Sequence, residues 1–274
     1  MTGTTDPFAS SDRLEEAQLE AIVTRLEARA THPAFVRMMD EYLDAMQVDA
    51  VASVIDLGSG TGVVARAIAR RPAFAGRVVG VDLSSYLVAT AERLAQEEGL
   101  GDRLEFRTGD STQLNMPDGS FDAAVAHTLL SHVTDPAAVI REAVRVVRPG
   151  GTFGFFDGDY ASLTFGHRDP DTARAFDEAI IAAWVASPRV MRQMPRLLAA
   201  AGLELVATFA DVLSEVGTAD YWRSGIQMYR RLLPATGAFT EAEANAWASD
   251  QMADSDAGIF FGASNFYAYV ARRP

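Results

Sequence analysis

The sequence predicts an α/β fold built on a doubly wound, mostly parallel β-sheet, and two observations support this prediction. Between residues 51 and 157, short apolar runs alternate with segments of helical spacing. Because parallel strands need long crossover connections, this alternation indicates βαβ units whose helices cover both faces of the sheet. The second observation is a glycine-rich turn, GSGTG at residues 58–62, which directly follows the first apolar run.

The expected strands are short and are separated by helices or by turn residues. They lie at residues 52–57, 77–82, 104–108, 121–127 and 152–157. Residues 63–70, 85–98 and 136–147 have helical spacing or propensity. The turn sequences PDG at residues 117–119 and RPGG at residues 148–151 stand where elements should end.

The two ends of the chain do not show this alternation of strands and helices. The first dozen residues are polar, and we expect them to be frayed. Residues 14–30 and 33–47 predict helices. Beyond the expected strands we predict a loop at 158–169, helices at 170–186 and 189–201, strands at 203–212 and 265–271, and a largely helical segment at 218–258. We therefore expect an N-terminal helical cap at residues 1–50 and one domain at residues 51–274, with helical lid insertions at about 158–201 and 215–260.

Composition excludes several chemistries. All 24 basic residues are arginine and there is no cysteine, so lysine Schiff bases, P-loop lysines, disulfides and thiol nucleophiles are ruled out. The net charge of −13 disfavours a nucleic-acid partner. The longest apolar run, at residues 179–186, is too short for a membrane span, and no secretion signal is visible. We expect a cytoplasmic protein that is a monomer or a homodimer, without a membrane partner or a metal.

The glycine turn is the strongest functional signal. Gly58, Gly60 and Gly62 leave room for the backbone to pass close to a ligand. A dinucleotide site has the spacing GxGxxG, whereas here the third glycine falls one residue early. Asp56, just before the turn, would repel a pyrophosphate but attract a ligand that carries ammonium and sulfonium groups. The turn therefore favours a cationic ligand over NAD.

Acidic residues also end the next two strands. Asp82 follows the second strand, where a carboxylate can accept hydrogen bonds from both hydroxyls of a ribose. Asp110 and Ser111 follow the third strand and can bond an exocyclic adenine amine. Because the carboxyl ends of parallel strands meet at one edge of a sheet, these residues together predict a site for an adenosine with a positively charged tail.

Four stretches of sequence resemble class I S-adenosylmethionine-dependent methyltransferases, a family that includes ubiquinone and menaquinone C-methyltransferases. They are VIDLGSGTG, VDLS, TGDSTQLNMPDGSFDAAVAHTLLSHVTDP and REAVRVVRPGG, within about residues 51–157. The resemblance implies a Rossmann-like sheet of seven strands with the last strand antiparallel, and S-adenosyl-L-methionine as cofactor. It places Gly58, Ser59 and Gly60 along the methionine part, Asp82 and Leu83 at the ribose, and Asp110 and Ser111 at the adenine.

Residues that end or follow the fourth and fifth strands are candidates for catalysis or substrate contact. His127 ends the fourth strand, where its ring could face the acceptor as a base; alternatively, only its backbone touches the cofactor while the ring bonds a neighbour. His132 stands near a helix start and either acts as a base or shapes the pocket. Asp157, Asp159 and Tyr160 follow the fifth strand and could orient or deprotonate a hydroxyl; alternatively, Asp157 caps the next turn and Asp159 is solvated.

These observations predict transfer of a methyl group to an oxygen or carbon atom of a small, partly apolar metabolite. Aromatic residues at Tyr221, Trp222 and Tyr229 could form a lid over such a substrate or belong to the core. An alternative keeps the same fold but uses the nucleotide structurally, as a binding module or a cyclase. A third option, an NAD-dependent oxidoreductase, is disfavoured by the glycine spacing.

Overall fold

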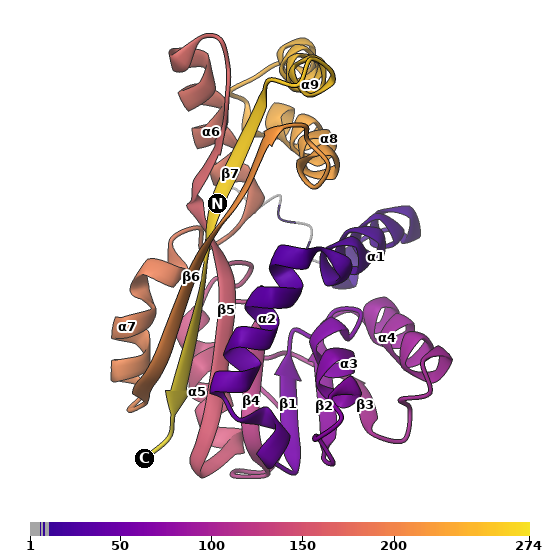
Figure 1. The fold of residues 1–274 in the computed structure, drawn as a ribbon, viewed down its shortest axis with the longest axis vertical. Helices are drawn as coiled ribbons and strands as arrows, with labels where there is room; N and C mark the ends of the chain where they lie inside the picture. The colour runs from indigo at the N-terminus through magenta and orange to yellow at the C-terminus, as the bar shows by residue number, and fades with distance from the viewer. Residues whose placement is uncertain (1–5, 7, 9–10) are drawn as a thin grey trace.

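A computed structural model of the 274-residue chain describes residue 6, residue 8 and residues 11–274. Its centre is a seven-stranded sheet with the order β3-β2-β1-β4-β5-β7-β6 (Figure 1). Neighbouring strands from β3 through to β5 pair in parallel, whereas β7 is antiparallel to both β5 and β6. The predicted α/β sheet with an antiparallel last strand is thus confirmed. The strands are β1 (Ser53–Leu57), β2 (Arg77–Asp82), β3 (Leu104–Thr108), β4 (Phe121–His127), β5 (Val147–Phe165), β6 (Glu204–Gly217) and β7 (Phe260–Arg272).

Several helices begin at residues whose side chains cap them. The Ser84 hydroxyl accepts a hydrogen bond from the Leu87 backbone N–H, and the Asp135 carboxylate accepts one from Ala138. None of the helices in the described part of the chain is long and apolar enough to cross a membrane. The α-helices are α1 (Glu16–Thr31), α2 (Pro33–Ala45), α3 (Val63–Arg70), α4 (Ser85–Glu97), α5 (Pro136–Val146), α6 (Pro170–Trp184), α7 (Val190–Ala200), α8 (Trp222–Leu232) and α9 (Glu241–Asp256).

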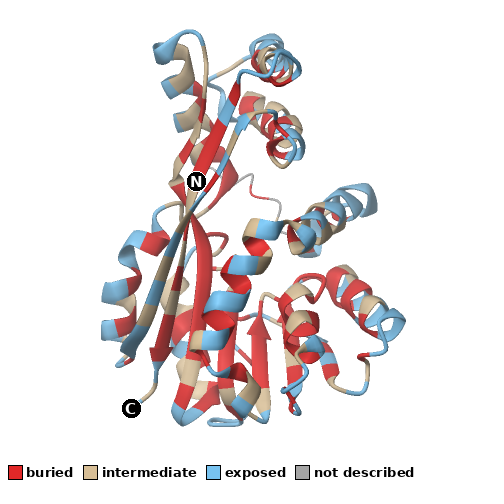
Figure 2. Cartoon of the chain, in the orientation of Figure 1, coloured by how far each residue is buried: buried red, intermediate tan, exposed pale blue. Residues whose placement is uncertain are grey.

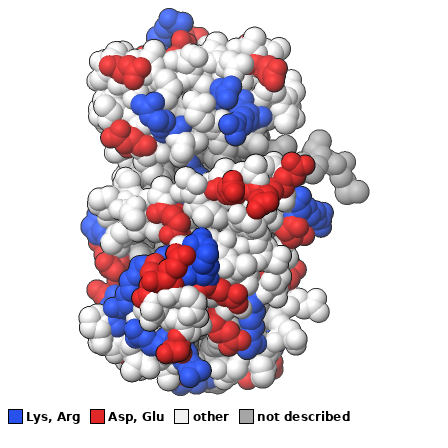
Figure 3. Space-filling view, turned by 90° about the vertical axis from the view of Figure 1, so that its right-hand side faces the viewer, with Lys and Arg blue, Asp and Glu red and all other residues white. Residues whose placement is uncertain are grey.

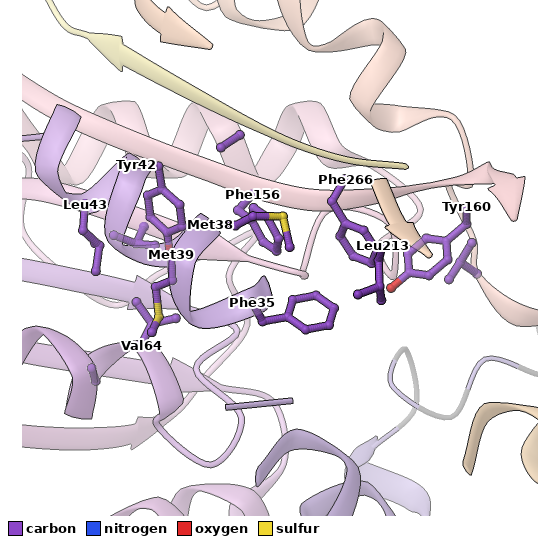
Figure 4. Close-up of a cluster of buried hydrophobic side chains, with 14 of the residues drawn as sticks. Phe35, Met38, Met39, Tyr42, Leu43, Val64, Phe156, Tyr160, Leu213 and Phe266 are labelled. Carbon is purple, nitrogen blue, oxygen red and sulfur yellow. The ribbon is translucent and has the colours of Figure 1, made fainter. Parts of the chain in front are cut away.

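Two hydrophobic cores lie on opposite faces of the sheet. On one face, side chains of α2, α3 and α4 pack on the strands; on the other, α5 and α7 do so. The central strands are accordingly buried along most of their length (Figure 2). In the first core, Tyr42 of α2 stacks on Phe156 of β5, and Phe156 stacks on Phe266 of β7 (Figure 4). This aromatic stack holds α2 against β5 and β7.

The strands β5, β6 and β7 extend beyond the carboxyl ends of β1 to β4. The helices α6, α8 and α9 lie around this extension, and we call these three helices the helical lobe (Figure 1). The loop expected at residues 158–169 is therefore wrong over 158–165, which extend β5. Asp159 of this extension pairs with Asn265, and Phe165 pairs with Gly262. The extension depends on β7, about one hundred residues later in the chain, and local sequence does not reveal such a partner.

The N-terminal segment is not simply frayed. Asp6 is fully buried, and a short 3-10 helix spans Ser11–Arg13. The rest of the first ten residues that we expected to be frayed, except residue 8, lies outside the described residues. The segment thus brings at least one carboxylate, that of Asp6, into the interior of the protein.

Candidate functional site

A cavity of about 470 Å³ lies at the carboxyl ends of β1, β2 and β4, beneath α1 and the helical lobe. At one end it is lined by the glycine turn and the strand-end acids, and at the other by aromatic side chains. Ten of the twelve predicted site residues line it, whereas Gly62 and Asp157 do not. Those ten are Asp56, Gly58, Ser59, Gly60, Asp82, Leu83, Asp110, Ser111, His127 and His132.

The glycine turn is shaped by close neighbours. Gly58 and Gly60 have φ angles of +64° and +53°, in the left-handed region that glycine tolerates best. A Cβ atom on Gly58 would lie 2.6 Å from Leu129, and one on Gly60 would lie 3.0 Å from Leu26 of α1. Gly62 forms the N-cap of α3 instead of lining the cavity. The turn therefore has to be glycine at these positions to fit between α1 and the loop that follows β4.

Two polar groups of the turn lack hydrogen-bond partners. Oδ2 of Asp56 and Oγ of Ser59 are buried and bond no group of the described chain. Burial, with a smaller contribution from the charge of Asp82, raises the pKa of Asp56 to about 7. Since buried polar groups are normally bonded, this pair is suited to a polar, positively charged ligand.

Asp82 is held by the turn that it faces. Its Oδ2 accepts a hydrogen bond from the Gly60 backbone N–H at 2.8 Å, and its Oδ1 accepts one from Ser84 at 2.9 Å. Burial raises the pKa of Asp82, while these backbone N–H groups act against that rise. A carboxylate has about four acceptor sites, so Asp82 keeps capacity for a ligand while it anchors the glycine turn.

Asp110, Leu83 and Ser111 line the open side of the cavity. Asp110 is exposed, and its Oδ1 accepts hydrogen bonds from the backbone N–H and the hydroxyl of Thr112, both at 2.7 Å. Ser111 is buried, and Leu83 is 40% exposed. The predicted adenine and ribose residues are therefore gathered at one edge, with an apolar side chain exposed beside them.

His127 is bonded to a neighbour. Its Nδ1 lies 3.0 Å from the hydroxyl of Tyr42, and its ring stacks on Phe156 at 4.4 Å between centroids. Burial, and secondarily the charge of Arg29, lowers the pKa of His127 to about 3. The ring is consequently neutral at ordinary pH and a weak proton acceptor.

His132 forms a pair with a residue that sequence reasoning missed. Its Nδ1 lies 2.9 Å from Oδ2 of Asp6, and the ring of Phe8 packs on it at 4.8 Å. Both partners of the pair are buried, and His132 lines the cavity. When the Nδ1 proton points to a carboxylate, Nε2 carries the free lone pair. In that tautomer the pair can accept a proton at Nε2.

Asp157 lies behind this pair and outside the cavity lining. Its carboxylate accepts hydrogen bonds from the backbone N–H and hydroxyl of Ser131 and from the backbone N–H of Gly158, at 2.8–3.0 Å. Burial raises its pKa. With its oxygens bonded in this way, Asp157 holds the loop that carries His132 rather than facing a substrate.

The far end of the cavity is aromatic and contains arginine. Phe35, Tyr160 and Trp184 line it and are almost completely buried. Arg29 lies over the ring of Phe35 at 4.9 Å and also lines the cavity. Of the expected lid residues, Trp222 and Tyr229 are buried in the core beyond the cavity lining. The wall is thus formed by aromatic residues other than the expected lid residues.

The missed residues had little local signal. Asp6 belongs to a polar segment, in which an acid reads as solvated. Arg25 and Arg29 stand four residues apart on α1 and so share one face of the helix, but an arginine on an amphipathic helix is normally exposed. Only the absence of an acidic residue on the same face of α1 could have suggested a functional role for Arg25 and Arg29.

The chain resembles known proteins along most of its length. A family model described as a methyltransferase domain matches residues 55–155. The chain is 32% identical over 264 residues to an uncharacterized 37.1 kDa protein in transposon TN4556 of Streptomyces fradiae, across 96% of this chain and 74% of that protein. It is 35% identical over 109 residues to the ubiquinone/menaquinone biosynthesis C-methyltransferase UbiE of Hahella chejuensis, across 40% of this chain and 44% of the relative, which is less than half of its length.

Among solved structures, the crystal structure of the 4+2 cyclase SpnF is similar. It superposes with a TM-score of 0.59 at 23% identity, over 94% of this chain and 95% of the cyclase. At this level of identity the likeness concerns the fold: the same layers of helices around the same type of sheet.

Proposed function

This chain belongs to the class I S-adenosylmethionine-dependent methyltransferases, with S-adenosylmethionine as its cofactor, and on that premise we propose that it methylates an oxygen or carbon atom of a small, partly apolar metabolite. The proposal rests above all on one cavity that joins the glycine turn to an aromatic wall, with His132 on its lining. A cofactor at one end and an apolar acceptor at the other would meet beside that histidine.

The residues present fit the cofactor. The unpartnered Asp56 carboxylate and Ser59 hydroxyl are suited to an ammonium group, and Asp82 and Asp110 retain acceptor capacity for ribose and adenine. Gly58 and Gly60 allow the turn to approach a ligand. We propose that these residues hold S-adenosylmethionine with its methionine part over the glycine turn.

Positioning dominates the proposed mechanism. When bound, S-adenosylmethionine supplies an electrophilic methyl group on a sulfonium and leaves as a neutral thioether. The chain has to hold the acceptor in line with that methyl group, and such orientation can contribute about 7–11 kcal/mol. The buried walls formed by Phe35, Tyr160 and Trp184 would exclude water from the acceptor and favour an apolar body.

An acceptor hydroxyl or acidic carbon must also lose a proton. We assign this proton to Nε2 of His132, with Asp6 as the positioning residue that holds the ring. His127 is less suited, because its pKa is lowered to about 3 and Tyr42 bonds its Nδ1. The proton moves to His132 as the oxygen–methyl or carbon–methyl bond forms and the sulfur–methyl bond breaks.

The experiment is a screen with methyl-labelled S-adenosylmethionine and the full chain. Phenolic, quinone and polyketide-like acceptors are each incubated with the protein, and labelled product and S-adenosylhomocysteine are quantified. We expect equal amounts of the two. An acceptor that is converted without release of S-adenosylhomocysteine would instead support a structural use of the nucleotide, and uptake of label by a polar amine alone would overturn the proposed acceptor class.

A further inference from the structure

Arg29 is a buried cation at the aromatic end of the cavity. It is 9% exposed and lines the cavity from α1. Its Nη2 donates a hydrogen bond to the hydroxyl of Tyr221 at 3.2 Å, and its Nε is buried without any acceptor in the described chain. A tyrosine hydroxyl is neutral, so this hydrogen bond leaves the charge of the guanidinium uncompensated.

No acidic side chain compensates Arg29. Within residues 6, 8 and 11–274, no carboxylate oxygen lies within 4.0 Å of a side-chain nitrogen of Arg29 or Arg25. The remaining residues, 1–5, 7, 9 and 10, include neither aspartate nor glutamate. The chain therefore contains no acid, described or not, that could be the missing partner.

The other arginine that is buried among the described residues has acidic partners. Arg66, which is also buried, contacts Glu27 at 2.6 Å and Glu98 at 2.5 Å. Over the lower half of the face shown in Figure 3, basic and acidic side chains lie next to one another. Because an unpaired buried charge is costly and arginine does not deprotonate, a protein that keeps one is expected to bind an anion there.

Further groups surround the same point. Arg25, one helical turn before Arg29, lies 5.6 Å from the ring centroid of Trp184 and lines the cavity. Tyr160 also lines the cavity and is 3% exposed, and its hydroxyl lies beside Arg29 and donates to no acceptor in the described chain. Two cations and one unused hydroxyl donor therefore converge where the wall is otherwise aromatic.

Arg25 and Arg29 extend from α1 toward the helical lobe. Arg25 donates to Ser224 and Arg29 to Tyr221, both near the start of α8 in the helical lobe. The side of α1 that approaches the glycine turn instead presents Leu26, next to Gly60. The cavity is thus acidic where the cofactor is assigned and basic at the opposite end, so the basic end belongs to the acceptor.

We propose that the acceptor carries an anionic group, a carboxylate or a phosphate, which Arg29 binds with help from Arg25 and Tyr160. This inference rests on the proposed function for the assignment of the two ends. The acceptor is then amphiphilic: its anion lies against Arg29, and its apolar body lies along Phe35 and Trp184 toward His132. The anion anchor sets which atom of the acceptor meets the methyl group.

Calorimetry on the full chain saturated with S-adenosylhomocysteine tests this site. The probes are octanoate, octyl phosphate and the neutral octanol, which share an apolar tail, and the two anions separate a carboxylate from a phosphate preference. We expect at least one anion to bind about tenfold or more tightly than octanol, and Arg29→Gln to abolish that difference. Arg29→Lys, which keeps the charge but loses the planar fork, should restore part of it.

Two controls keep the result interpretable. Arg223→Gln removes another arginine without an acidic partner, on α8 but outside the cavity lining, and should change nothing. If Arg29→Gln does not fold, the less buried Arg25→Gln provides the same comparison. Equal binding of all three probes, or anion binding unaffected by both cavity variants, would overturn the proposal.

The cofactor is the other possible source of the anion. If Arg29 binds its carboxylate, Arg29→Gln will weaken S-adenosylhomocysteine but not 5′-methylthioadenosine, which lacks the amino-acid part, and the proposal fails. We expect both affinities to be unchanged. Failure to detect methyl transfer would reject the proposed function and leave these binding results valid, whereas failure of anion binding would leave methyl transfer intact.

Discussion

Oδ2 of Asp6 lies 2.9 Å from Nδ1 of His132, and both side chains are buried although 126 residues separate them in the chain. The contact ties the N-terminal segment to the loop after β4. Asp157 supports that loop from behind through Ser131. A histidine that lines the cavity is thus held on one side by a carboxylate and on the other by its own loop.

Replacing either member of this pair should slow turnover. We expect His132→Gln to lower kcat about 10²–10⁴-fold because the proton acceptor is lost, and Asp6→Asn to lower it roughly ten- to a hundredfold because only the orientation is lost. Calorimetry should show unchanged affinity for S-adenosylmethionine. His167→Gln is the control, since His167 bonds Asp169 away from the cavity. Wild-type turnover in His132→Gln would exclude the base role.

Asp82 should contribute to both cofactor affinity and stability. Asp82→Asn replaces an oxygen that accepts a backbone hydrogen bond, so we expect the free energy of unfolding to fall by about 1–3 kcal/mol and S-adenosylmethionine affinity to fall roughly ten- to a hundredfold. Urea unfolding and calorimetry measure the two effects. Asp110→Asn, at an exposed carboxylate, should lower affinity with little change in stability. Unchanged affinity in Asp82→Asn would refute the ribose assignment.

Cofactor binding should depend on pH through Asp56. Its pKa is raised to about 7, so the carboxyl is neutral below that pH and attracts a cation only above it. We expect S-adenosylmethionine affinity to fall as pH drops from about 8 to about 6, with proton release on binding detectable by calorimetry in buffers of different ionisation enthalpy. Asp56→Asn should bind more weakly and lose this pH dependence. The same variant should stabilise the ligand-free protein above about pH 7, because the charge that burial penalises is gone.

Tyr42 should matter for stability rather than for proton transfer. Tyr42→Phe removes the hydroxyl at Nδ1 of His127, and we expect the free energy of unfolding to fall by roughly 0.5–1.5 kcal/mol. His127 is neutral above about pH 4 because its pKa is lowered to about 3. The pH–rate profile should therefore keep its inflections. A shifted inflection in Tyr42→Phe would mean that His127 titrates during the reaction.

Replacing Gly62 should impair folding. Its φ is +77°, and a Cβ would lie 2.7 Å from the ring of Phe106. We expect Gly62→Ala to lose more than the roughly 1–3 kcal/mol that a left-handed backbone alone costs. Gly99→Ala isolates that backbone cost, because Gly99 has φ +71° and nothing near its Cβ position. Equal losses in urea unfolding would show that Phe106 gives way.

The features that sequence reasoning predicted correctly are local. Strands β1 to β4 could be located because the bounds of each strand coincide with those of a short apolar run in the sequence. Asp56 and Asp82 stand at the ends of two of these runs. The extension of β5 was missed because residues 158–165 are strand only through pairing with β7. The N-terminal segment was misjudged because the burial of Asp6 depends on His132.

The sequence by itself determined the type of sheet, the glycine turn and the edge at which strand-end acids gather, because these follow from short-range periodicity and from the geometry of parallel strands. Only the tertiary structure decided which distant side chains face the cavity. Burial makes His127 a weak base, Asp6 lies within hydrogen-bond distance of His132, and Arg29 contacts no acid among the described residues. Burial and contacts between remote segments determine the charge and hydrogen bonding of these groups, and neither is encoded in the neighbouring sequence.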